Sequence, residues 1–199
     1  MNNLFNTQFF HIVLLFLSAV SQQLSSQLQK DMAANAVTLD DQTLMIKKEV
    51  VGGGTIDLID GTTERVDGIC NFDKDKLQTG RAFVFDKISL CYATDAASGK
   101  EGELAYSTVP PKELQNAILI IKQDGRVVFT GEVRDIANIE TGQNADDEYT
   151  QLRSLRHFVD DRTITMQLKF PPGVSLSGAA KHYVYLRMNG LQTAKKPTV

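Results

Sequence analysis

The sequence predicts an all-β fold: an antiparallel β-sandwich, with a jelly roll favoured, that carries an N-terminal α-helix and one short inserted helix. Short runs rich in β-branched and aromatic residues alternate with turn signals from residue 37 to residue 191, and no strand–helix–strand rhythm is visible. An immunoglobulin-like sandwich is the second choice, but the chain has no Trp and therefore no Cys…Trp…Cys pattern.

The N-terminal segment, residues 1–36, differs from the rest of the chain. Residues 1–29 contain no Lys, Arg, Asp or Glu, and an apolar run extends from Phe9 to Val20. The run is too short to cross a bilayer comfortably, because a helix needs about 20 apolar residues to span the hydrocarbon. After it, an apolar residue recurs at every fourth position, at Val20, Leu24, Leu28 and Met32. This spacing predicts a continuous helix from about Asn6 to Ala34 with a narrow apolar stripe in its second half.

Three fates of this segment fit its composition: a retained helix, a cleaved signal peptide or a disordered tail. Ala19-Val20-Ser21 resembles a signal cleavage site. A signal peptide also has a positively charged region before its apolar run, and here no Lys or Arg precedes that run. We therefore expect a retained helix that is buried against partner subunits or a membrane. The residues expected to make this assembly or membrane contact are Phe9, Phe10, Ile12, Val13, Leu14, Leu15, Phe16, Leu17, Leu24 and Leu28.

The body of the chain, residues 37–193, reads as about eight or nine strands, followed by a polar tail of residues 194–199. The expected strands include residues 43–51, 55–59, 81–93, 117–123, 126–130, 163–170 and 182–188. In the strand over 81–93 the apolar phase slips near Asp86, which predicts a bulge or a strand that crosses from core to edge.

The dipeptide Asp124-Gly125 gives the strongest hairpin signal in the chain. In the strand before it, Ile118 and Ile120 share one face and Leu119 and Ile121 share the other. We therefore expect this strand to be buried on both sides, under a neighbouring subunit or the inserted helix.

One helix is expected to interrupt the strands. Asn144 can cap it, and Arg153 and Arg156 would then face outward. Apolar or aromatic residues recur at helical spacing, at Tyr149, Leu152, Leu155 and Phe158. The acidic run Asp146-Asp147-Glu148 would lie in the first turn of this helix, where the helix dipole stabilises negative charge, and Asp160-Asp161 would follow its end.

Composition excludes some classes of function. The formal net charge of −3 gives no electrostatic footprint for nucleic acid, so no sequence-specific nucleic-acid binding is expected. The pairs Arg153/Arg156 and Lys195/Lys196 are interpreted as solvated charges. Cys70 and Cys91 are too few for a disulfide scaffold, and we expect free, buried thiols, with one disulfide as the alternative.

No motif predicts a catalytic centre, a metal site, a cofactor or a small-molecule substrate. The three histidines, His11, His157 and His182, include no pair four residues apart. The series Asn71, Asp73 and Asp75 has the spacing of the first ligands of a calcium loop, but Lys76 and Ala82 stand where that loop needs Gly and Glu, so a solvated loop is expected. An enzyme is the third alternative, and it would need residues such as Asp86, Asp135 or Glu140 to meet in a cleft.

Residues 37–192 resemble, in length and strand cadence, the single jelly-roll capsid proteins of tailless icosahedral viruses, including bacterial viruses with a membrane inside the shell. The stretch from Leu168 to Pro172 and the closing strand from Tyr183 to Met188 fit this style. At 199 residues the chain is too short for a double jelly roll. The resemblance implies a non-enzymatic structural role in the virion, as a capsid or vertex subunit.

The same resemblance implies that the partners are identical and other capsid subunits and, through the N-terminal helix, an internal membrane. The competing interpretation is a secreted or surface-anchored β-sandwich that binds a glycan or serves in adhesion. Residues 1–21 would then be a signal peptide.

Overall fold

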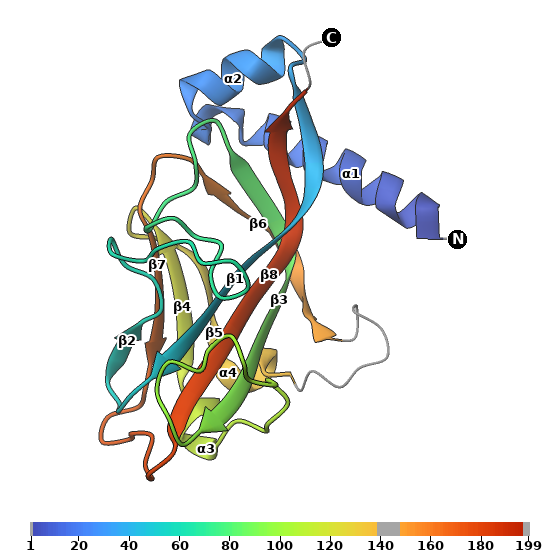
Figure 1. The fold of residues 1–199 in the computed structure, drawn as a ribbon. Coiled ribbons are helices and arrows are strands. Elements are labelled where there is room, and N and C mark those ends of the chain that lie inside the picture. Colours follow the sequence, from blue (N-terminus) through green and yellow to red (C-terminus); the bar gives the residue numbers. More distant parts are fainter. Residues whose placement is uncertain (1, 139–147, 197–199) are drawn as a thin grey trace.

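The computed structural model describes residues 2–138 and 148–196, where eight strands form two four-stranded antiparallel sheets (Figure 1). The strands are β1 (Val37–Val50), β2 (Thr55–Asp57), β3 (Ala82–Asp95), β4 (Ile118–Gln123), β5 (Arg126–Glu132), β6 (Thr150–Val159), β7 (Ile164–Lys169) and β8 (Lys181–Lys195). The first sheet has the order β1-β8-β3-β6 and the second the order β2-β7-β4-β5. The predicted all-β, antiparallel sandwich is confirmed.

The main core lies between the two sheets. The first sheet contributes residues such as Leu44, Phe85 and Leu186, and the second contributes Leu119 and Met166. The rings of Phe83, Phe85 and Phe158 stack within this core, with centroids 5.4–6.5 Å apart. The short helices α3 (Lys112–Gln115) and α4 (Val133–Ile136) add Leu114, Val133 and Ile136 to it.

A β-bulge at Asp86 divides strand β3 into two phases. The register of β3 with both β6 and β8 shifts between Phe85 and Lys87, which confirms the predicted bulge. Before the bulge Phe83 and Phe85 point into the main core, and after it Ile88, Leu90 and Tyr92 do so. Gly190 of β8 lies opposite Phe85, and a Cβ there would lie 2.0 Å from the Val84 carbonyl oxygen. Only glycine fits this close approach of two backbones.

The predicted hairpin is confirmed. Asp124 and Gly125 both have positive φ, 47° and 77°, as a two-residue type I′ turn requires, and they join β4 to β5.

Within this chain β4 is buried on one side only, and burial of its other side under a neighbouring subunit stays a prediction. Leu119 and Ile121 are fully buried in the main core, whereas Ile118 is 39% exposed and Ile120 is half-buried. The reason is that the outer face of this sheet has no helix over it among the described residues.

The prediction of an inserted helix is wrong, because residues 150–159 form the edge strand β6. Asn144 lies outside the described residues. The apolar residues fell at helical spacing because β6 is covered on both faces: Leu152 and Phe158 contact the main core, while Leu155 and Val159 pack on the opposite side. A strand with apolar residues on both faces loses its simple alternation, so periodicity alone does not separate it from a helix.

The N-terminal segment is helical but not continuous. It consists of α1 (Asn2–Ala19), a 3-10 turn η1 (Ser21–Gln23) and α2 (Ser26–Ala33). Leu24 and Ser25 are extended, with ψ near 150°, and they break the helix. The Ser25 hydroxyl accepts a hydrogen bond from the backbone N–H of Leu28, so Ser25 caps α2 and favours the break.

The two neighbours Leu119 and Ile118 provide a test of which face of β4 is the core. Leu119→Ala should lower the free energy of unfolding by about 2–5 kcal/mol, because it leaves a cavity in a packed core. Ile118→Ala should change it by roughly 0.5 kcal/mol or less, as for an exposed side chain. Urea denaturation of both variants measures the difference, and equal losses would contradict the assignment of the faces.

Candidate assembly surface

The N-terminal arm, residues 2–36, lies across one end of the β1-β8-β3-β6 sheet (Figure 1). In this view α1 passes behind β1 and β8, and its N-terminal end points away from the strands. The backbone N–H of Lys196 donates to the Ala36 carbonyl, 2.9 Å away, so the end of β8 and the start of β1 close the sheet beside the arm.

One side of the arm is buried against this sheet. Val13, Leu17, Leu24 and Leu28 are at most 4% exposed, and they form a second apolar cluster with the outer face of the sheet. Each strand of the sheet contributes one or two residues to this cluster: Leu39 of β1, Ala82 and Val84 of β3, Val159 of β6 and Leu191 of β8. Four of the residues expected to contact partners or a membrane are therefore packed inside this chain.

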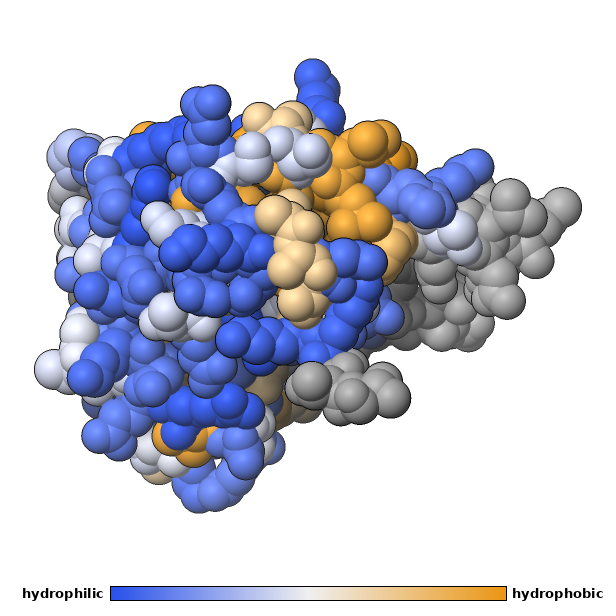
Figure 2. All heavy atoms as spheres, turned by 90° about the horizontal axis from the view of Figure 1, so that it is seen from above, coloured by the Kyte–Doolittle hydropathy of each residue, from blue (hydrophilic) through white to orange (hydrophobic). Residues whose placement is uncertain are grey.

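The opposite side of α1 exposes large apolar side chains. Ile12 is 52% exposed, Leu14 37% and Leu15 71%, while Phe9, Phe10 and Phe16 are half-buried at the border of the second cluster. Figure 2, seen from the end where the arm lies, shows apolar side chains gathered on one side of a mostly hydrophilic face. For this exposed set, contact with a partner or a membrane stays a prediction. Within residues 2–138 and 148–196, no helix is both long and apolar enough to cross a membrane.

A polar anchor fixes the arm at the break between its helices. The Ser25 hydroxyl donates to Oδ2 of Asp160, 2.8 Å away, at the end of β6. Asp160 is 2% exposed, and the same oxygen accepts a hydrogen bond from the backbone N–H of Gly80. Asp160 was expected to follow an inserted helix, but it follows a strand and holds the arm. Ser25 marks the start of α2, but no signal in the sequence links it to Asp160.

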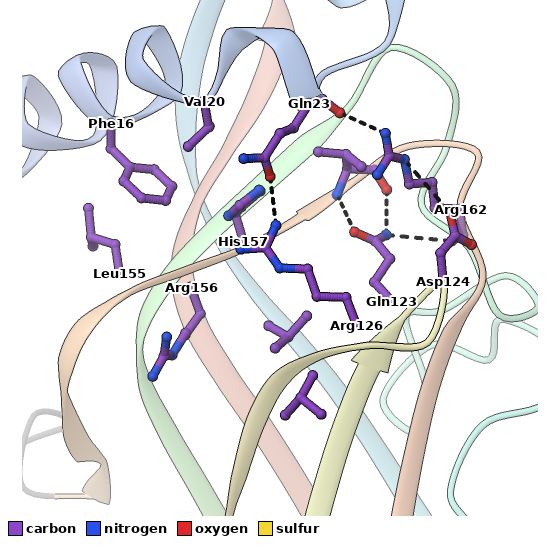
Figure 3. A pocket seen from close by; sticks show the side chains of 13 residues that line it. Phe16, Val20, Gln23, Gln123, Asp124, Arg126, Leu155, Arg156, His157 and Arg162 are labelled. Carbon is purple, nitrogen blue, oxygen red and sulfur yellow. Dashed lines mark hydrogen bonds and ion pairs between the residues drawn. The ribbon is translucent and has the colours of Figure 1, made fainter.

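A cavity of about 270 Å³ lies between the arm and the sandwich (Figure 3). Two arginines that line this cavity reach Gln23 of the arm. Arg126 Nη1 donates to the Gln23 side-chain oxygen at 2.8 Å, and Arg162 Nη2 donates to the Gln23 carbonyl at 3.1 Å. The Arg162 Nε also lies 3.8 Å from Oδ2 of Asp124, so the hairpin turn takes part in the same contact.

His157 lines this cavity beside the arm. Its ring meets Phe16 edge to face, with centroids 5.3 Å apart. Burial lowers the pKa of His157 below its ordinary value of 6.5, and the positive charges of Arg126 and Arg162 lower it further. The structure therefore favours a neutral imidazole under the arm.

The other histidine considered for a metal site is remote from this cavity. His182 lies at the opposite end of β8 from the arm, where its Nδ1 shares a hydrogen bond with the Tyr92 hydroxyl. The described residues hold no group of three or more His, Cys, Asp or Glu side chains placed for a metal. Asn71 lies in a loop, as expected, and its side-chain oxygen accepts a hydrogen bond from the backbone N–H of Met45 in β1, 2.7 Å away.

A second buried charge was missed by the sequence analysis. Arg187 of β8 is 5% exposed and pairs with Glu148, with 3.0 Å between Nη1 and Oε2. Its guanidinium lies 4.8 Å from the ring centroid of Tyr149 and 5.0 Å from that of Tyr185. Glu148 and Tyr149 therefore anchor the start of β6, where they were expected to begin a helix. Asp146 and Asp147 lie outside the described residues.

Both cysteines are buried, and neither is in a disulfide, as predicted. Cys91 lies under Arg187, 3.4 Å from Nη2, and burial raises the pKa of Cys70. Of the acidic residues named for an enzyme, Asp86 accepts from Gln151 at 2.6 Å, Asp135 lies exposed in α4, and Glu140 lies outside the described residues.

Ser25→Ala should destabilise the chain by about 1–3 kcal/mol, because it removes the cap of α2 and leaves the buried Asp160 carboxylate with one donor fewer. Ser26→Ala, one residue further on, is the matched control, and it should change stability little. Thermal or urea unfolding measures both. Equal effects of the two substitutions would show that the anchor contributes nothing.

Acidification should loosen the arm through His157. Since the pKa of His157 is lowered by folding, its stabilising contribution is complete above about pH 6.5 and is lost as the pH falls toward the folded pKa. The melting temperature of the His157→Gln variant should therefore fall less than that of the wild type when the pH is lowered from about 7.5 to about 5.5. Parallel pH profiles of the two proteins would contradict this.

No family model matches the chain, and no curated protein matches its sequence.

Proposed function

We propose that this chain is a non-enzymatic structural subunit of a virus particle, a capsid or vertex subunit built on a jelly roll. It would assemble with identical and other shell subunits through its sandwich and its N-terminal arm. The observation that carries the proposal is the exposed apolar side of α1 on an arm that is itself fastened to the sandwich.

The strand pairing supports the jelly roll. β1 pairs with β8, β2 with β7, β3 with β6 and β4 with β5, so the pairs are nested around the β4–β5 hairpin. One long antiparallel ribbon that folds over on itself produces this nesting. The pairs β3·β8 and β4·β7 then join the folded ribbon into two four-stranded sheets. Eight strands divided between two such sheets are the arrangement of jelly-roll shell proteins.

The exposed side of α1 supports assembly. Contiguous apolar surface on a soluble protein marks a contact with a protein or a membrane. Ile12 and Leu15 are large side chains that remain more than half exposed, although Val13 and Leu17 of the same helix find a complete apolar environment. The arm therefore covers the outer face of its own sheet and still has exposed apolar side chains available for a partner or an internal membrane.

The packing of α1 favours this proposal over the secreted or surface-anchored binding module. Cleavage after Ser21 would remove Val13 and Leu17 from the apolar cluster in which Val84 and Leu191 are buried. A mature chain without these residues would expose the outer face of its own sheet. Peptide mapping of the N-terminus of the mature protein distinguishes the two functions, since a chain that starts at Gln22 would support the binding module.

Leu15→Asp should prevent assembly while the sandwich stays folded, because an unpaired charge in an apolar contact costs several kcal/mol. Val51→Asp is the matched control, since Val51 is 68% exposed and lies outside the arm. Light scattering and electron microscopy of the full chain measure assembly, and thermal melting checks folding. A wild-type chain that stays a monodisperse monomer without partners or detergent would contradict the proposal.

A further inference from the structure

Four positions on the solvent side of α1 follow one another at intervals of four, three and four residues. They are Gln8, Ile12, Leu15 and Ala19, and all four are exposed. Steps of alternately three and four residues return to one side of a helix, and they are the spacing of a and d positions where two helices pair. In that scheme Ile12 and Ala19 occupy a positions, while Gln8 and Leu15 occupy d positions. We call these four residues the seam.

The seam lies on the side of α1 that faces away from its own sheet. Val13 and Leu17, which are buried against the sheet, occupy the b and f positions of the same repeat. A second helix can therefore lie along the seam without displacing α1. The N-terminal end of α1 also points away from the strands, which leaves room for a neighbour (Figure 1).

We propose that the seam pairs in parallel with the seam of a second copy of this chain, an inference that rests on the proposed role in assembly. A β-branched residue at a and leucine at d, as in Ile12 and Leu15, favour two parallel strands. Parallel pairing in register also places Gln8 beside its counterpart, where each amide can donate to the other. Antiparallel pairing would place Gln8 opposite Ala19, which offers no side-chain partner.

A second copy fits the seam better than a lipid surface does. Helices that lie on membranes combine an apolar face with lysines and arginines that attract anionic headgroups. Residues 1–29 contain neither lysine nor arginine, and no acidic residue either. The same lack of charge allows two identical helices to approach each other without repulsion.

Cysteine cross-linking of the full chain tests the seam. Leu15→Cys places a thiol on the seam, and Leu14→Cys, one residue away, places an exposed thiol beside it. Because Cys70 and Cys91 are buried, the unsubstituted chain should give the background. Under mild oxidation Leu15→Cys should form disulfide-linked dimers about ten-fold faster than Leu14→Cys, since pairing raises the effective concentration of seam thiols.

Three outcomes would overturn the proposal. Equal cross-linking of the two variants would mean that the seam is not the contact. Faster linkage between mixed Ile12→Cys and Leu15→Cys chains than within either would indicate antiparallel pairing. Failure of Leu15→Cys to cross-link when phosphatidylcholine vesicles are present before oxidation, with flotation of the chain, would assign the seam to lipid.

The same samples separate this inference from the proposed function. If light scattering detects assembly of both cysteine variants, but neither cross-links above background, the seam fails and the assembly role stands. If the unsubstituted chain and both variants remain monomeric, both proposals fail.

Discussion

Burial of both faces of the β1-β8-β3-β6 sheet is the requirement on which the rest of the structure depends. A sandwich sheet usually keeps one face in water. Here the inner face packs on the second sheet, one part of the outer face lies under the arm, and another part lies under Tyr106, which packs on Cys91, Ala93 and Tyr183. The arm is therefore a third layer of the fold, and its loss would expose a sheet face built for apolar contact.

Polar contacts fix where this third layer lies. The apolar cluster under the arm stabilises its packing on the sheet, but the hydrophobic effect is not directional. The Ser25–Asp160 hydrogen bond and the arginine contacts to Gln23 fix the position of the arm on the sheet. Arg187 has a similar role on the same sheet, because a buried guanidinium needs its partner Glu148 in place. Buried charge thus orders the chain at both ends of β6.

Features that depend on neighbouring residues could be predicted from the sequence. The Asp124-Gly125 turn and the Asp86 bulge were predicted, because each leaves a mark within a few residues. The inserted helix was wrong because both faces of β6 are covered, and that covering comes from distant segments. The apolar cluster that joins Val13 and Leu17 to Val84 and Leu191 could not be predicted for the same reason, since no local pattern links residues so far apart. The arm was recognised as apolar, but its division into a buried and an exposed side needed the fold.

The pairing of β1 with β8 has a consequence for synthesis of the chain. The arm leaves the ribosome first, whereas Leu191, part of the surface that covers it, belongs to the last strand. At a translation rate of ~5–20 residues per second, the last strand is complete roughly 10–35 s after the apolar run from Phe9 to Val20 has been synthesised. During this time β1 has no partner strand, and the arm lacks the part of its cover that Leu191 supplies. The nascent arm is therefore the segment that a chaperone would have to hold until translation passes β8.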